Sequence, residues 1–138
     1  MRLILATLII LAGVGVALAA PKLANQTIMT YSPGHGTQVE YYDKQGGTWL
    51  WYPGNKVVLP GRWKTERGNI CFGYTSNSYN PVTGHSGAGW ECQPLKIFES
   101  VVVERAAGDV FGLAKRAKPP FSLPKRRTSI EALSKRLK

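Results

Sequence analysis

The stretch from residue 61 to residue 74 constrains the fold most strongly, because its composition is that of a β-hairpin. Gly68 and Asn69 separate two strand-type runs, and both residue types tolerate the positive φ angles that a two-residue hairpin turn requires. With these two residues as the turn, Trp63 is expected to lie opposite Tyr74. Since side chains alternate between the faces of a strand, the buried face of this hairpin is expected to carry Trp63, Thr65, Phe72 and Tyr74.

The amino terminus has the pattern of a secretory signal peptide. Arg2 precedes an apolar run from residue 3 to residue 18, and Ala17 and Ala19 supply the small side chains of a cleavage site. We therefore expect residues 1–19 to be a signal peptide and the mature protein to be periplasmic or secreted. An uncleaved membrane anchor is the alternative, because about 18 apolar residues can just cross a bilayer.

The chain contains two cysteines, Cys71 and Cys92. In an oxidising compartment an isolated pair of this kind is usually a disulfide. Cys71 is expected on the face of the hairpin opposite to Trp63, from which it can reach Cys92 on a neighbouring strand. The chain-entropy relation assigns such a cross-link about 3 kcal/mol of stabilisation. The alternative is a pair of buried, unpaired thiols.

Short strand-type segments alternate with turn-type segments over the middle of the chain. Because connections this short join antiparallel neighbours, the pattern predicts a mainly β fold, either a small antiparallel meander or a partly open barrel, with one disulfide. The expected strands are 38–42, 48–52, 56–59, 62–66 and 70–74, with a weaker one at 27–31, and the expected turns are 43–47, 53–55, 60–61 and 68–69.

Residues 97–103 follow the second cysteine as an apolar segment whose β-branched run favours a strand, with a helix over residues 98–107 as the alternative. Residues 110–113 are expected to return as its partner strand. Together with the preceding strands, these segments define a disulfide-linked β domain over residues 20–113.

The positive charge of the chain is concentrated at its carboxy terminus. Residues 20–113 hold eight Lys and Arg against seven Asp and Glu, a net charge of +1, whereas residues 114–138 hold nine Lys and Arg against Glu131 alone, a net charge of +8. Such a basic tail is expected to contact an anionic membrane surface or an envelope polymer. Its basic residues are Lys115, Arg116, Lys118, Lys125, Arg126, Arg127, Lys135, Arg136 and Lys138.

The end of the tail has the pattern of a short basic amphipathic helix. Thr128 and Glu131 have the spacing of a capping box, and Ile130, Leu133 and Leu137 fall on one helical face. A helix this short is marginal alone in water. We expect the β domain to fold without the tail, which is predicted to add nothing to the core.

Aromatic residues and a long polar loop are the candidates for ligand binding. The tryptophans and tyrosines of the predicted sheet can stack on a sugar ring or a base, and the alternative is that they form the core. The loop from residue 75 to residue 89 is long for a small domain, and loops of this length are often functional. The candidate ligand-binding residues are Asn77, Tyr79, His85 and Trp90.

No arrangement of residues singles out a catalytic site or a metal site. The histidines, His35 and His85, lie far apart in the chain, and the cysteines are better explained as a disulfide. Ser86 beside His85 lacks a fixed orienting group, and no two acidic residues have a spacing that marks a glycosidase pair. We therefore expect a protein that is not an enzyme and binds no cofactor, with a small secreted hydrolase as the least favoured alternative.

Three short motifs after a signal peptide resemble the pattern of a group of small exported bacterial proteins of uncharacterised function. The motifs are Gly61-Arg-Trp63, Gly68-Asn-Ile-Cys71 and Trp90-Glu-Cys92. The resemblance covers residues 37–93, and it implies a β-rich periplasmic or secreted module without catalytic residues. Gly47-Thr-Trp49 is also similar to the opening of lipocalin-like barrels, but about five short strands fall short of an eight-stranded barrel.

These observations predict an exported binding or envelope-associated module whose basic tail contacts anionic surfaces. The alternative is a secreted lectin-like or inhibitor-like domain that binds a glycan or a protein through the aromatic sheet or the loop at residues 75–90. Nucleic acid is not expected as a partner, because an exported protein seldom meets it.

Overall fold

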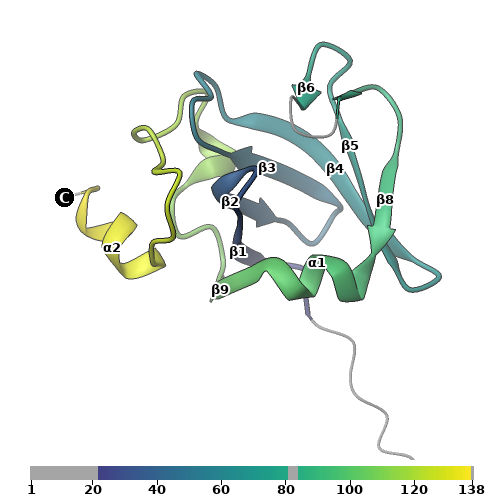
Figure 1. Ribbon diagram of the computed structural model, residues 1–138, viewed down its shortest axis with the longest axis horizontal. Helices are drawn as coiled ribbons and strands as arrows, with labels where there is room; N and C mark the ends of the chain where they lie inside the picture. Colours follow the sequence, from purple (N-terminus) through teal and green to yellow (C-terminus); the bar gives the residue numbers. More distant parts are fainter. Residues whose placement is uncertain (1–21, 81–83, 138) are drawn as a thin grey trace, which may run out of the picture.

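The computed structural model describes residues 22–80 and 84–137 of the chain. The expected signal peptide, residues 1–19, lies outside this part. Within it, no helix is both long enough and apolar enough to span a membrane. A seven-stranded antiparallel sheet dominates the fold and curls into a half barrel, which confirms the mainly β class (Figure 1).

The strands are β1 (Gln26–Ser32), β2 (Gly36–Tyr42), β3 (Gly47–Trp51), β4 (Leu59–Glu66), β5 (Asn69–Tyr74), β6 (Tyr79–Asn80), β7 (His85–Ser86), β8 (Glu91–Pro94) and β9 (Val102–Ala107). The helices are α1 (Leu95–Val101), α2 (Ile130–Lys135) and the short 3-10 helix η1 (Leu113–Lys115). The large sheet has the strand order β8-β5-β4-β3-β2-β1-β9, and β6 pairs with β7 in a separate two-stranded sheet.

The helix α1 connects the two edges of the large sheet. The strands β8 and β9 lie at opposite edges, yet they are consecutive in the chain, and α1 joins them. Its Phe98 packs against Tyr42 and Phe72 of the sheet, with ring centroids 6.3 and 6.0 Å apart. The helix therefore covers one face of the curled sheet, called the inner face below (Figure 1).

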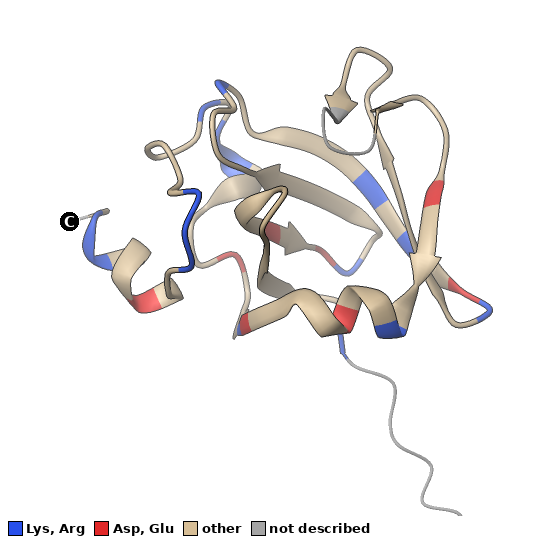
Figure 2. Ribbon diagram, viewed as in Figure 1, with Lys and Arg blue, Asp and Glu red and all other residues tan. Residues whose placement is uncertain are grey.

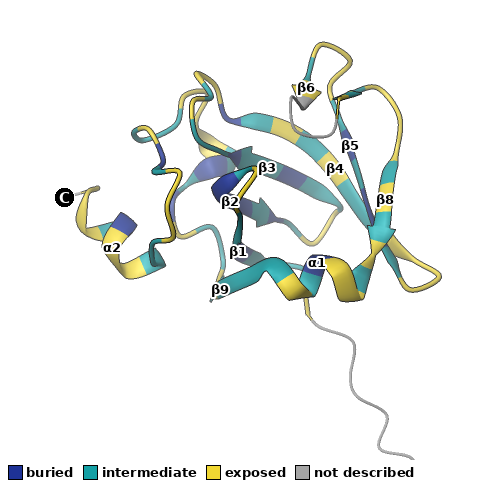
Figure 3. Cartoon of the chain, in the orientation of Figure 1, coloured by how far each residue is buried: buried dark blue, intermediate teal, exposed yellow. Residues whose placement is uncertain are grey.

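The sheet separates two hydrophobic cores. The inner core consists of Leu23, Ile28, Tyr42, Ile70 and Phe98. The outer core, on the opposite face, combines sheet residues with residues that follow β9, and buried residues appear on the strands and on α2 alike (Figure 3). The buried members of the outer core are Met29, Val39, Trp51, Val58, Phe111, Leu113, Leu123 and Leu133.

The hairpin between β4 and β5 forms, but its turn lies one residue earlier than predicted. Arg67 and Gly68, with φ angles of 51° and 76°, occupy the turn, and Asn69 begins β5. The partners shift by two residues, so Trp63, Thr65, Phe72 and Tyr74 still share one face, which is the inner one, although Thr65 is exposed there and not buried as predicted. The observed pairs include Gly61 with Tyr74, Trp63 with Phe72, and Thr65 with Ile70.

Two predictions for the segment before this hairpin are wrong. Residues 56–58 belong to no strand, and the turn expected at residues 60–61 lies inside β4. The backbone N–H of Val58 instead donates a hydrogen bond of 2.9 Å to the carbonyl oxygen of Ala117. This segment is therefore held by the carboxy-terminal part of the chain and not by a neighbouring strand.

The predictions for the segment after the second cysteine also need correction. Residues 98–107 are divided between the end of α1 and β9, so helix and strand are each right for one part. Residues 110–113 form no strand. Phe111 and Leu113 instead fill the outer core, where they are 1% and 0% exposed.

The expectation that the tail adds nothing to the core is wrong. Leu123 and Leu133 are 4% and 1% exposed in the outer core, and Phe121 packs against it. The indole N–H of Trp51 donates a hydrogen bond of 3.0 Å to the carbonyl oxygen of Phe121. The described part of the tail therefore completes the outer face of the β domain.

The predicted short helix at the end of the tail exists as α2, but its first residues differ from the prediction. Ser129 is the N-cap in place of Thr128, and its hydroxyl oxygen accepts a hydrogen bond from the N–H of Ala132. The N–H of Ile130 donates to a carboxylate oxygen of Glu104 in β9 at 2.8 Å. The start of α2 is therefore attached directly to the edge of the sheet.

Candidate functional site

A carboxylate surrounded by three hydroxyl groups lies on the inner face of the sheet. Glu40, in β2, is 7% exposed. Its Oε2 accepts a hydrogen bond from the Tyr42 hydroxyl, and its Oε1 accepts one each from the Thr48 and Tyr74 hydroxyls, all at 2.7 Å. These four residues, called the Glu40 cluster below, come from the strands β2, β3 and β5.

The strand register and one glycine bring the Glu40 cluster together. Tyr42 lies directly opposite Thr48, and Glu40 shares its face because it is two residues away. Tyr74 belongs to β5, which is separated from β3 by β4. Its partner in β4 is Gly61, where a Cβ atom would lie 2.6 Å from Cδ1 of the Tyr74 ring. The glycine therefore allows Tyr74 to lie across β4 and to reach Glu40.

Two adjoining cavities occupy the inner face. The larger cavity has a volume of about 360 Å³ and includes Glu40 and Tyr42 in its wall. The smaller cavity has a volume of about 210 Å³ and extends to Tyr79 and His85 of the loop that follows β5. The residues that line both are His35, Gln38, Leu50, Phe72, Tyr74 and Glu91.

Burial makes the Glu40 carboxyl harder to ionise. Desolvation raises its pKa above the ordinary value of 4.5, and the three hydroxyl hydrogen bonds, which stabilise the ionised form, offset part of this increase. Burial and the neighbouring Glu40 charge also raise the pKa values of Tyr42 and Tyr74 well above 10.0. Both tyrosines therefore keep their hydroxyl protons and can act as donors to Glu40.

Two of the four candidate ligand-binding residues line a cavity. Tyr79, which is 62% exposed, and His85 form part of the smaller cavity. Nε2 of His85 lies 3.8 Å from a carboxylate oxygen of Glu91. Asn77 is exposed and lines neither cavity, and the same holds for Trp90.

Trp90 lies on the outer side of the sheet, away from the two cavities. The Arg62 guanidinium and the Lys64 ammonium group each lie 4.9 Å from the centroid of its ring. A Cβ atom at Gly73 would come within 3.5 Å of the indole, so the ring packs closely on β5. These contacts give Trp90 a structural role between strands.

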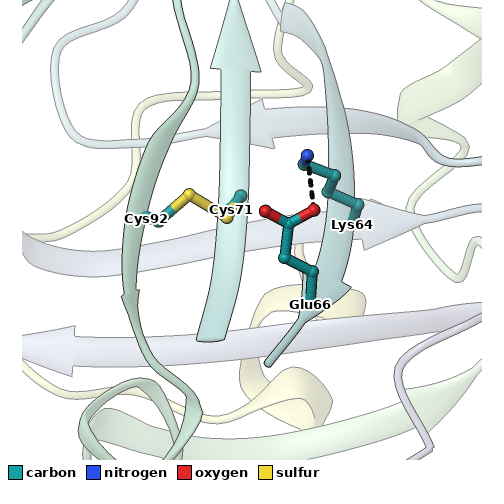
Figure 4. Close-up of a disulfide and its surroundings, with 4 residues drawn as sticks. All are labelled: Lys64, Glu66, Cys71 and Cys92. Carbon is teal, nitrogen blue, oxygen red and sulfur yellow. Dashed lines mark hydrogen bonds and ion pairs between the residues drawn. A yellow bond between two sulfur atoms is a disulfide. The ribbon is translucent and has the colours of Figure 1, made fainter. Parts of the chain in front are cut away.

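Cys71 and Cys92 form the predicted disulfide, which links β5 to the edge strand β8 (Figure 4). The two residues lie directly opposite each other in the ladder. Lys64 and Glu66 form an ion pair of 2.8 Å beside the disulfide on the same face. Because β8 also carries Glu91, the disulfide holds one wall of the cavities in place.

The basic residues of the tail that the structure describes are all exposed, and Figure 2 shows the positions of Lys and Arg along the ribbon. The Arg127 guanidinium lies 5.0 Å above the Tyr31 ring, and Lys135 forms an ion pair of 2.6 Å with Glu131. One of these residues, Lys125, also lines the smaller cavity. The exposed residues are Lys115, Arg116, Lys118, Lys125, Arg126, Arg127, Lys135 and Arg136, while Lys138 lies outside the described residues.

Sequence reasoning missed the Glu40 cluster. One signal was present, because Gln38, Glu40 and Tyr42 alternate with Val39 in a strand-type run, which places a carboxylate in phase with an aromatic residue. Its other partners come from two further strands, and they can be identified only once the register is known. Across residues 22–80 and 84–137, no group of three or more His, Cys, Asp or Glu side chains is arranged to hold a metal ion.

No protein-family model matches the chain, and neither a curated protein sequence nor a solved structure matches it. The resemblance to small exported bacterial proteins therefore stays a prediction. The function has to be inferred from the Glu40 cluster, the two cavities and the charge of the carboxy-terminal segment.

Proposed function

We propose that the protein is a non-enzymatic binding module that takes a small, partly apolar ligand into the inner-face cavities. The observation that carries this proposal is the pair of adjoining open cavities, of about 360 and 210 Å³, which are lined by sheet, helix and loop residues. Ligand pockets in proteins typically combine apolar and aromatic walls with a few polar groups that orient the ligand. The cavities have this composition, since Leu50 and Phe72 line both and the Glu40 cluster supplies polar atoms.

The proposal includes a location outside the cytoplasm, in the periplasm or in the medium. The disulfide between Cys71 and Cys92 is compatible with an exported protein, because such bonds persist in oxidising compartments. The signal-peptide pattern at residues 1–19 supports the same location.

A neutral apolar fluorophore, N-phenyl-1-naphthylamine, tests for ligand binding without an electrostatic contribution. Its fluorescence should rise on addition of the purified protein. Leu50→Trp places a large ring in the shared wall of both cavities and should weaken dye binding by at least about tenfold. Val57→Trp adds the same ring at a position that is 54% exposed and outside both cavities, so it should leave dye binding unchanged.

Circular dichroism and thermal unfolding should establish that both variants are folded. If a folded Leu50→Trp variant binds the dye as well as the wild type does, the cavities are not the binding site. The proposal also fails if the wild-type protein does not bind the dye.

A second candidate function is attachment to an anionic surface through the carboxy-terminal segment. The eight described Lys and Arg residues of this segment are all exposed, and Leu137 beside them is 41% exposed. Each basic residue near an anionic membrane contributes about 1 kcal/mol of attraction, and an exposed leucine can add apolar contact. Together these contributions are sufficient for reversible attachment.

Charge reversal is the appropriate test, because removal of the segment would also remove part of the outer core. Lys115, Lys118 and Arg126 are exposed, so changing all three to Glu should spare the fold. This variant should lose co-sedimentation with phosphatidylglycerol vesicles at low salt. The matched control changes three exposed lysines elsewhere to Glu and should retain more of the binding: Lys44, Lys56 and Lys96. Equal loss in both variants would indicate that only the net charge matters.

A further inference from the structure

The larger cavity has an acidic and aromatic wall, although the net charge of the chain is +10. Its lining includes two carboxylates, Glu40 and Glu91, and one histidine, His35, but neither Lys nor Arg. Aromatic faces attract cations, and proteins use aromatic cages to recognise ammonium groups. The aromatic residues of this wall on the inner face are Tyr42, Phe72, Tyr74 and Phe98, whereas the Tyr31 ring lies on the outer side, under the Arg127 guanidinium.

While Glu40 is ionised, the hydrogen bonds within the Glu40 cluster leave it able to accept further hydrogen bonds but not to donate them. Tyr42 and Tyr74 each have one hydroxyl proton and donate it to Glu40, while the single proton of Thr48 is divided between Glu40 Oε1 at 2.7 Å and the carbonyl oxygen of Tyr41 at 2.9 Å. The remaining capacity consists of lone pairs on the three hydroxyl oxygens and on the carboxylate. A ligand group that binds at the cluster must therefore bring its own N–H or O–H.

Among the described residues, no Lys or Arg forms an ion pair with Glu40, and Arg105, whose charge acts on the neighbouring Tyr42, is paired with Glu99. The ion pairs in this part of the chain involve other carboxylates, and the three donors to Glu40 are neutral hydroxyls. Buried charges are normally paired, because an unpaired charge loses its hydration without compensation. A ligand cation would supply the missing charge, whereas both Glu40 and Glu91 would repel a ligand anion.

We propose that the larger cavity binds a small organic amine in its protonated form, with the ammonium group beside Glu40 and the apolar body against Phe72 and Phe98. This inference rests on the proposed ligand-binding function and names the chemical class of its ligand. A neutral carbohydrate would also bring O–H donors to the cluster. The test must therefore separate a charged donor from a neutral one.

Three probes with the same aromatic body separate these classes. They are 2-phenylethylamine, which is a cation at neutral pH, 2-phenylethanol, which is a neutral donor, and 3-phenylpropanoate, which is an anion. Isothermal titration of the purified protein should show that the amine binds at least about tenfold more tightly than the alcohol. The carboxylate should bind most weakly.

Glu40→Gln keeps the shape of the side chain but removes its charge, so it should reduce the advantage of the amine by about tenfold. Binding of the alcohol should change little. Glu66→Gln removes an equal charge from the exposed outer side, where Glu66 pairs with Lys64, and should leave all three affinities unchanged. If Glu40→Gln does not fold, Glu91→Gln provides the second test and should reduce the advantage by a smaller factor, about two- to fivefold.

Equal binding of the three probes, or a preference for the alcohol or the carboxylate, overturns the inference. So does an advantage of the amine that survives in a folded Glu40→Gln variant. The neutral dye then shows whether the proposed function fails as well. Dye binding that Leu50→Trp abolishes leaves the ligand-binding function standing, whereas absence of both dye and amine binding removes both proposals.

Discussion

Replacement of Leu133 by Ala is expected to lower the free energy of unfolding by about 2–3 kcal/mol. Leu133 lies in α2, is 1% exposed and belongs to the outer core with Met29, Val39 and Trp51. The change removes three carbon groups at about 0.8 kcal/mol each, and an unfilled cavity raises the usual range for such changes to about 2–5 kcal/mol. Because α2 is a short helix near the chain end, it can move to fill part of the space, which favours the lower half of this range.

Urea denaturation followed by tryptophan fluorescence measures the effect, since Trp51 belongs to the same core. Leu137→Ala is the matched control, because Leu137 is 41% exposed and its loss should change the free energy of unfolding by less than about 0.5 kcal/mol. If Leu133→Ala is as stable as this control, the carboxy-terminal segment does not contribute to the core. The expectation from the sequence, a tail that can be removed without loss of the fold, would then be correct.

Three further predictions concern the disulfide, the hairpin and the buried carboxyl. Changing both Cys71 and Cys92 to Ser should lower the free energy of unfolding by about 2–4 kcal/mol, and a wild-type denaturation midpoint that is insensitive to a reductant would contradict this. Trp63→Ala should lower the free energy of unfolding by about 3 kcal/mol, because the indole packs on the inner core. Lys64→Ala should lower it by less than about 1 kcal/mol. The reverse ranking would show that the inner face is assigned wrongly. Because burial raises the pKa of Glu40 above 4.5, the folded state holds this proton to higher pH than the unfolded state does. The stability of the wild type relative to Glu40→Gln should therefore be greatest below about pH 4.5 and fall as the pH rises through the folded pKa. A difference in free energy of unfolding between the two proteins that stays constant from pH 4 to about pH 8 would refute this.

Most strands of the large sheet were predictable from local chemistry. Strand-type runs and turn residues alternate clearly, and β2, β3 and β5 follow the predicted runs to within two residues at each end. The alternation of side chains in β4 and β5 was also sufficient to predict that Trp63 and Phe72 share the buried face. The same alternation places Cys71 on the outer face, where it can reach Cys92 on the neighbouring strand, so the disulfide was predictable as well.

The position of the hairpin turn was not predictable, because Gly68 fits either of two neighbouring turns. The observed register places Gly61 opposite Tyr74, and it allows the Tyr74 hydroxyl to reach Glu40, which is 34 residues away in the chain. Arg67 accepts a positive φ angle in this register. Local residue preferences alone do not select the turn at Arg67 and Gly68. The register that this turn sets is the one in which Tyr74 reaches Glu40.

The contribution of the tail to the core was missed for a related reason. Leu123 and Leu133 are separated by Pro124 and three basic residues, and no helical or strand period connects them. Their burial depends on the path of the chain over the outer face of the sheet. The candidate site shows the same limit, since the Glu40 cluster combines residues from three strands whose register a single sequence does not specify.

The packing of the outer face explains how the inner face can contain cavities. A domain of this size must bury enough apolar surface to offset the loss of chain entropy. The outer core provides such burial, and Trp51 packs edge-on against Phe111 and Phe121 with ring centroids 5.5 and 5.0 Å apart. Because this core and the disulfide stabilise the sheet from the other side, the inner face can leave space unfilled and can tolerate the desolvation of Glu40. A ligand that neutralises Glu40 would remove part of that cost, so ligand binding at this site should raise the thermal stability of the whole sheet.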